Sequence, residues 1–178
     1  MRSDDQALID DLAAPHRASP AFKRLMARGQ AALPAILEGL AHTSADARYH
    51  CCRLLDHLLT PDALGPLMGM LDDPDARVRW SALHSLTCDR CKEGMCLPTD
   101  GPLLAAAMRL LATDPSAHVR AHAIGAVGRS MHDDPAALAA IEAAAASDPS
   151  PAVRKKARWY APGGPIYRRT ARRAAVGR

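Results

Sequence analysis

The chain has 178 residues, of which 48% are apolar and only 3% are aromatic. The apolar residues are mainly Ala and Leu, which favour helices, whereas strand-forming residues are scarce. No apolar run is long enough to cross a membrane, and the acidic start is not followed by the apolar segment of a secretory signal. We therefore expect an all-α, cytoplasmic protein whose five cysteines do not form a disulfide framework.

Charge is distributed unevenly along the chain. Residues 154–178 hold nine Lys/Arg and no Asp/Glu, whereas the preceding residues hold more acidic than basic side chains. The sequence pI of about 9.0 therefore reflects the C-terminal end. The charge shift, the helical pattern and the cysteine cluster together predict four regions: N-terminal capping helices in 1–29, a repeat region in 30–161, a cysteine-rich insertion within it at 88–97, and a basic C-terminal tail at 162–178.

Helices are predicted in the N-terminal region and in the repeat region. In the N-terminal region they cover residues 4–13 and 20–28. In the repeat region, segments with helical apolar spacing lead into a turn, and a second helix follows each turn. These leading helices are predicted at 33–40, 64–71, 103–111 and 136–146.

The turns between these helices share a sequence. Residues 73–79, 114–120 and 148–154 each begin with Asp-Pro and end with Val-Arg, and residues 44–50 are a weaker copy. Asp caps the free N–H groups of the next helix, and Pro is tolerated in its first turn. The copies end 29, 41 and 34 residues apart, which is typical of repeated helical hairpins.

The Asp-Pro-x-x-x-Val-Arg turn resembles the HEAT repeat, particularly the short bacterial type that phycobilisome lyases also contain. This resemblance implies a right-handed α-solenoid of about four hairpins. It also implies that Asp and Arg side chains of successive repeats form a ladder, in which the weaker copy, with His50 at its last position, is a weak step. The implied ladder residues are Asp73, Arg79, Asp114, Arg120, Asp148 and Arg154.

In HEAT-like stacks the second helix of each pair lines a concave face, so the resemblance also implies a binding surface. It would display Arg48, Arg77, Trp80, His84, His118, His122 and Lys155. Among these, Arg77, Trp80, His118 and His122 are candidate partner-binding residues, and Trp80 is the strongest because Trp often marks a contact hot spot. The alternative is that these side chains are solvated faces of amphipathic helices, or that Trp80 packs against the next repeat.

The insertion contains three of the five cysteines within nine residues. His84, Cys88 and Cys91 would share one helix face, and Gly94 could turn the chain so that Cys96 returns towards them. Thiolates and imidazoles are zinc ligands, so these four residues are a candidate site for one structural zinc ion. The alternatives are reduced cysteines, a disulfide or redox pair, covalent bilin attachment, or an iron–sulfur cluster that takes a further ligand from Cys51 or Cys52.

The basic tail combines arginine with aromatic residues. Arg168, Arg169, Arg172 and Arg173 follow Trp159, Tyr160, Ile166 and Tyr167. Arginine contacts phosphate and aromatic rings stack on bases, so the tail could bind a nucleic acid. It could equally bind an acidic protein or an anionic membrane surface. In the competing interpretation the aromatic side chains cover the end of the repeat stack, followed by a loose solvated tail.

No phosphate-binding loop, dinucleotide-binding glycine motif, nucleophile elbow or His-Glu-x-x-His motif occurs in the sequence. We therefore expect a non-enzymatic scaffold or adaptor that binds a protein partner. The alternatives are a nucleic-acid-binding protein and, from the lyase resemblance, a tetrapyrrole chaperone or lyase. The sequence leaves the partner and the oligomeric state open.

Overall fold

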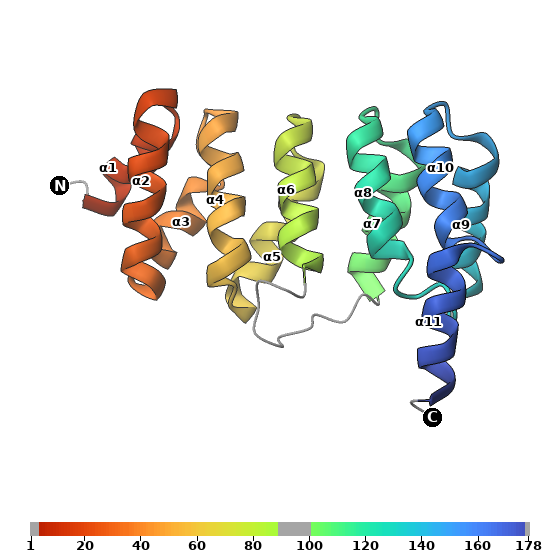
Figure 1. Ribbon diagram of the computed structural model, residues 1–178. Coiled ribbons are helices and arrows are strands. Elements are labelled where there is room, and N and C mark those ends of the chain that lie inside the picture. The colour runs from red at the N-terminus through yellow and green to blue at the C-terminus, as the bar shows by residue number, and fades with distance from the viewer. Residues whose placement is uncertain (1–3, 89–100, 177–178) are drawn as a thin grey trace. The chain divides into compact units, whose positions relative to one another are not determined.

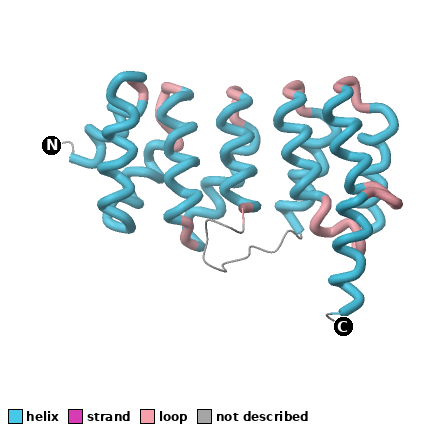
Figure 2. Tube along the Cα trace, viewed as in Figure 1, coloured by secondary structure: helices cyan, strands magenta, loops and turns pink. Residues whose placement is uncertain are grey.

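The computed structural model describes residues 4–88 and 101–176, with side chains up to residue 171, and over these residues the regular structure is entirely helical (Figures 1 and 2). The chain divides into two compact units, Met1–Leu97 and Pro98–Arg178. We call them unit 1 and unit 2. The predicted all-α fold built from HEAT-like hairpins is confirmed.

Unit 1 consists of three helical hairpins, each made of two helices in sequence. Its elements are α1 (Asp4–Leu12), α2 (Pro15–Arg28), η1 (Gly29–Ala32), α3 (Leu33–Gly39), α4 (Ala45–Leu58), α5 (Pro61–Gly69), η2 (Met70–Asp72) and α6 (Ala76–Thr87). The two N-terminal helices pack against each other and against α4, so they form a hairpin of the same kind as the later ones. The second of them begins at Pro15 and contains Pro20, whereas its start was expected at residue 20.

Unit 2 consists of two further hairpins and a final helix. Its elements are α7 (Gly101–Thr113), α8 (Ala117–Val127), α9 (Pro135–Ser147), α10 (Pro151–Tyr160) and α11 (Pro165–Val176). The last helix follows a turn in which Gly163 has a φ of 81°, a conformation that favours glycine. Residues 165–176 are helical in the structure, whereas one interpretation of the sequence expected a loose tail at this end.

The Asp-Pro turns are closed by hydrogen bonds that repeat from copy to copy. A carboxylate oxygen of Asp73, Asp114 and Asp148 accepts a hydrogen bond from the backbone N–H two residues later, at distances of 2.7 to 2.8 Å. These bonds satisfy backbone groups that would otherwise lack a partner where one helix ends and the next begins. The Asp-Pro signal in the sequence thus corresponds to a specific turn geometry.

The core is made of aliphatic side chains. Leu54, Leu83, Ile124 and Ile141 are fully buried, and each such side chain stabilises the fold by roughly 1.5–3 kcal/mol. None of the six aromatic residues of the chain is buried. Within the described ranges no helix is both long and apolar enough to span a membrane.

Candidate protein-binding face

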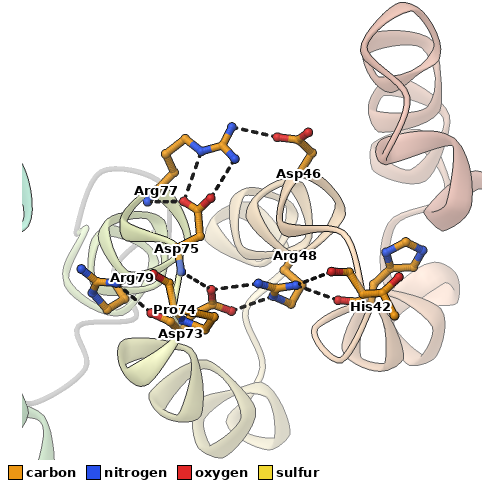
Figure 3. A network of polar contacts seen from close by, with 9 residues as sticks. His42, Asp46, Arg48, Asp73, Pro74, Asp75, Arg77 and Arg79 are labelled. Carbon is orange, nitrogen blue, oxygen red and sulfur yellow. Dashed lines mark hydrogen bonds and ion pairs between the residues drawn. The ribbon is translucent and has the colours of Figure 1, made fainter.

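Arg48 is the centre of a polar network that joins two hairpins of unit 1 (Figure 3). Its guanidinium donates to both carboxylate oxygens of Asp73, with distances of 2.7 and 3.0 Å. It also donates to the backbone carbonyls of His42 and Thr43 at 2.9 and 3.0 Å. The side chains of Arg48 and Asp73 are only 13% and 3% exposed, so the pair is largely removed from solvent.

The helix starts show that Arg48 occupies the ladder position of the first copy. It lies three residues after the start of α4, as Arg79 does in α6, Arg120 in α8 and Arg154 in α10. Each of these arginines donates to the backbone carbonyl six residues earlier. The sequence alignment that paired His50 with Arg79 was therefore wrong by two positions. Arg48 does not belong to the exposed face on which it was expected.

The same ion pair recurs in unit 2. Arg120 donates to both carboxylate oxygens of Asp148 at 2.8 and 2.9 Å, and both side chains are less than 10% exposed. The hydrogen bonds from Arg120 outweigh the opposing effect of burial and lower the pKa of Asp148. A two-bond Arg–Asp pair therefore links successive hairpins in each unit.

Arginine side chains also fasten each Asp-Pro turn to the helix that follows it. Arg79 donates to the backbone carbonyls of Asp73 and Pro74 at 2.8 and 3.1 Å. Arg154 donates in the same way to the carbonyls of Asp148 and Pro149, at 2.6 and 3.2 Å. The arginine of the repeat is thus a structural residue of the turn in both units.

Arg77, a predicted partner-binding residue, lies at the exposed edge of the network in Figure 3. Its guanidinium contacts Asp46 and Asp75, each at 2.8 Å, and its side chain is 56% exposed. The hydrogen bonds with Asp75 and then Asp46 raise the pKa of Arg77. A partner that recruits Arg77 would have to compete with these two carboxylates.

The three aromatic residues of unit 1, called the aromatic row below, lie one on each second helix. Phe22 lies on α2, Tyr49 on α4 and Trp80 on α6, so each second helix carries one, and all three side chains are half-buried. Figure 1 shows these helices side by side, and α4 packs against both of its neighbours. We call the row, together with the adjacent His50, Arg53 and His84, the second-helix face.

Arg53 connects this row across α2 and α4. Its guanidinium carbon lies 4.9 Å from the centroid of the Phe22 ring and 5.7 Å from that of Tyr49, both within the range of a cation–π interaction. His50 packs edge-on against Phe22, and Trp80 stacks on His84 with ring centroids 5.7 Å apart. The aromatic rings are thus held in place while each remains partly accessible.

A pocket of about 550 Å³ opens beside Arg53, which is within the size range of ligand pockets. Lys23 and Arg53 are exposed at its edge, whereas Asp46 is paired with Arg77. The pocket therefore combines an apolar wall with two accessible positive charges. Its lining comes from α1, α2 and α4 and comprises Leu12, Pro15, Ala18, Ser19, Phe22, Lys23, Asp46, His50 and Arg53.

His50 is a titratable group in the lining of this pocket. Burial, followed by the nearby Arg53, lowers the pKa of His50, and the Asp46 carboxylate only partly opposes the shift. The Nδ1 atom is buried without a hydrogen-bond partner. The imidazole therefore stays neutral to a lower pH than an exposed histidine would.

The structure brings two of the predicted metal ligands together and adds a third. His84 and Cys88 lie near Asp56, which comes from α4. The other two predicted ligands, Cys91 and Cys96, lie outside the described residues. Asp56 was missed because it belongs to the previous hairpin, where no sequence motif marks it.

The remaining predicted binding residues lie in unit 2. His118 is exposed and His122 half-buried, and both are on α8. Arg168 and Arg169 are exposed on α11, and Arg172 and Arg173 belong to the same helix. All of these residues belong to unit 2.

The C-terminal aromatic residues contribute to packing within unit 2. Tyr160 packs directly against Gly128, at the end of α8, where a Cβ atom would collide with its ring. Tyr167 contacts the His132 ring at a centroid distance of 4.5 Å, and His132 is hydrogen-bonded to Thr170 at 2.8 Å. Trp159, in contrast, is 43% exposed. Tyr160 and Tyr167 therefore pack α10 and α11 against residues that lie between α8 and α9.

A family model described as HEAT repeats matches residues 33–109. No curated protein matches the chain. The family match, the hairpins and their Asp–Arg pairs agree with the HEAT-like repeats that the sequence predicted.

Two solved structures have a similar fold. The complex of CpcE and CpcF of phycocyanin lyase from Nostoc sp. PCC7120 contains a chain that is 21% identical, with a TM-score of 0.67 and coverage of 88% of this chain and 96% of that one. A designed armadillo repeat protein in complex with the peptide (KR)4 is 17% identical, with a TM-score of 0.57 and coverage of 89% and 80%. At these identities the likeness concerns the fold alone.

Proposed function

We propose that this chain is a non-enzymatic scaffold that holds an extended segment of a partner protein on its second-helix face. The observation that carries the proposal is the position of the aromatic residues. The core excludes all six of them, and three stand one per second helix in unit 1. Half-exposed aromatic and arginine side chains are the residue types enriched in protein interfaces.

The pocket defines the chemistry of the partner segment. Leu12, Ala18 and Phe22 provide an apolar wall that accepts an aliphatic or aromatic side chain. Lys23 and Arg53 stand beside it with their charges accessible, so a carboxylate is the complementary neighbour. The proposed ligand is a linear segment in which an apolar residue is flanked by Asp or Glu.

Burial makes two of the cysteine thiols poor candidates for nucleophiles. Cys51 and Cys52 are fully buried, and burial raises the pKa of both thiols, that of Cys52 to about 12. The reactive form of cysteine is the thiolate, so these side chains act as small core residues. Reduced, buried thiols also fit the proposed cytoplasmic location.

Two other functions are tested alongside this one. The fold likeness to a phycocyanin lyase subunit suggests a tetrapyrrole chaperone or lyase, and the exposed Arg168 and Arg169 suggest a nucleic-acid ligand. The apolar wall and the two cations of the 550 Å³ pocket are also compatible with a carboxylate-bearing tetrapyrrole or with a phosphate. A bilin and a labelled oligonucleotide are therefore the comparison ligands.

A selection from a library of random linear peptides tests the proposal. We expect enriched sequences to pair an apolar residue with Asp or Glu, and we expect Phe22→Ala to abolish the enrichment. Lys155→Ala, at an exposed residue of unit 2, is the matched control and should leave it unchanged. Enrichment that Phe22→Ala does not affect, or binding of only the bilin or the oligonucleotide, would overturn the proposal.

A further inference from the structure

Three side chains of different chemistry converge where α4 meets α6. Asp56 comes from α4, whereas His84 and Cys88 are four residues apart at the end of α6. One ligand atom from each, namely a carboxylate oxygen, an imidazole nitrogen and a sulfur, lies within 4.8 Å of the other two. This is a possible ligand set contributed by two successive hairpins.

The separation of two of these atoms fits a bound ion. Asp56 Oδ2 lies 3.6 Å from His84 Nε2, which is longer than a hydrogen bond between them. Two ligands at about 2.0 Å from a tetrahedral ion are separated by roughly 3.3 Å. The carboxylate and the imidazole therefore need only a small adjustment to share one ion.

The surroundings limit how far these side chains can move. The Asp56 side chain is only 9% exposed, and the His84 ring stacks on Trp80. A pocket of about 190 Å³, lined in part by Asp56 and His84, lies beside them and has room for a water molecule as a fourth ligand.

We propose that Asp56, His84 and Cys88 bind a zinc ion. Zinc accepts oxygen, nitrogen and sulfur ligands in one tetrahedral site, whereas magnesium and calcium prefer oxygen alone. The ion would link the second and third hairpins of unit 1 beside Trp80. The site shares His84 with the second-helix face, and it requires no ligand from the cysteines beyond the described residues.

Zinc titration of the full-length, reduced protein tests this inference. We expect about one zinc per chain after dialysis and a melting temperature that rises by several degrees with zinc. Asp56→Asn and His84→Gln should each remove both effects, whereas His16→Gln, at an exposed histidine on α2, should remove neither. Circular dichroism of the metal-free variants shows whether each one is folded.

Cobalt substitution identifies the ligands independently. A thiolate-to-cobalt charge-transfer band should be present in the parent protein and absent from Cys88→Ser. The inference is overturned if the protein binds no stoichiometric metal. It is also overturned if folded Asp56→Asn and His84→Gln keep the metal, or if binding depends only on Cys91 and Cys96.

Discussion

Arg48 donates hydrogen bonds to both carboxylate oxygens of Asp73, which lies 25 residues later in the next hairpin. The same geometry joins Arg120 to Asp148 in unit 2. Removing one partner of a buried ion pair is costly because the other charge stays buried without compensation. These pairs are therefore expected to determine how firmly successive hairpins are held together.

Arg48→Met should lower the free energy of unfolding by about 3 kcal/mol, because it leaves the Asp73 carboxylate buried without its cation. Arg77→Met is the control, since the Arg77 ion pairs are exposed and should contribute less than about 1 kcal/mol. Urea denaturation followed by circular dichroism measures both. Equal losses in the two variants would contradict the structural role of the Arg48 pair.

Gly128→Ala should destabilise unit 2 by about 1–3 kcal/mol, because the added Cβ atom would overlap the Tyr160 ring. Gly125→Ala is the matched control on the same helix, where the nearest atom of Tyr160 is 3.8 Å away. It should be neutral or stabilising, since Ala favours helix over Gly. If Gly128→Ala lowers the stability by the same amount when Tyr160 is also replaced by Ala, the collision with the Tyr160 ring is not the cause of the loss.

Stability should fall as the pH drops below about 6.5, in part because of His50. Its folded-state pKa is lowered by burial and by Arg53, so the unfolded chain takes up a proton first. The neutral His50 imidazole contributes stability that is fully present above the pKa it has in the unfolded chain. This stability is lost as the pH falls through the lower pKa of His50 in the folded protein. His50→Phe keeps a ring at this position and should flatten the pH dependence between about pH 5 and 7, as measured by thermal melting. An unchanged slope would show that His50 does not contribute.

The Asp-Pro turns made the fold predictable, because capping and the Pro position are local properties of the sequence. The first copy was aligned two residues away from its true position, since His42 replaces the Asp and no Pro follows. Helix α11 was missed because a loose tail was expected there, whereas Pro165 is the first residue of the helix.

The candidate face was only partly predictable. Trp80 was identified because Trp often marks a contact hot spot, but Phe22 and Tyr49 were not, although aromatic residues of every kind are rare in this chain. Their alignment became visible only once the helices that carry them were placed side by side. Asp56 was missed for a similar reason. Predicting which residues meet between hairpins requires a correct alignment of the repeats, and the weak first copy did not provide one.

Selection of an acidic, partly apolar segment by Arg53 and the aromatic row is the main functional proposal for this chain. Its most direct test is the affinity of a selected peptide and of its Asp/Glu→Lys counterpart for the parent protein and for Arg53→Glu, measured by fluorescence anisotropy at two salt concentrations. We predict that the parent prefers the acidic peptide, more strongly at low salt, and that Arg53→Glu reverses the preference. Equal preference in both proteins would contradict the account.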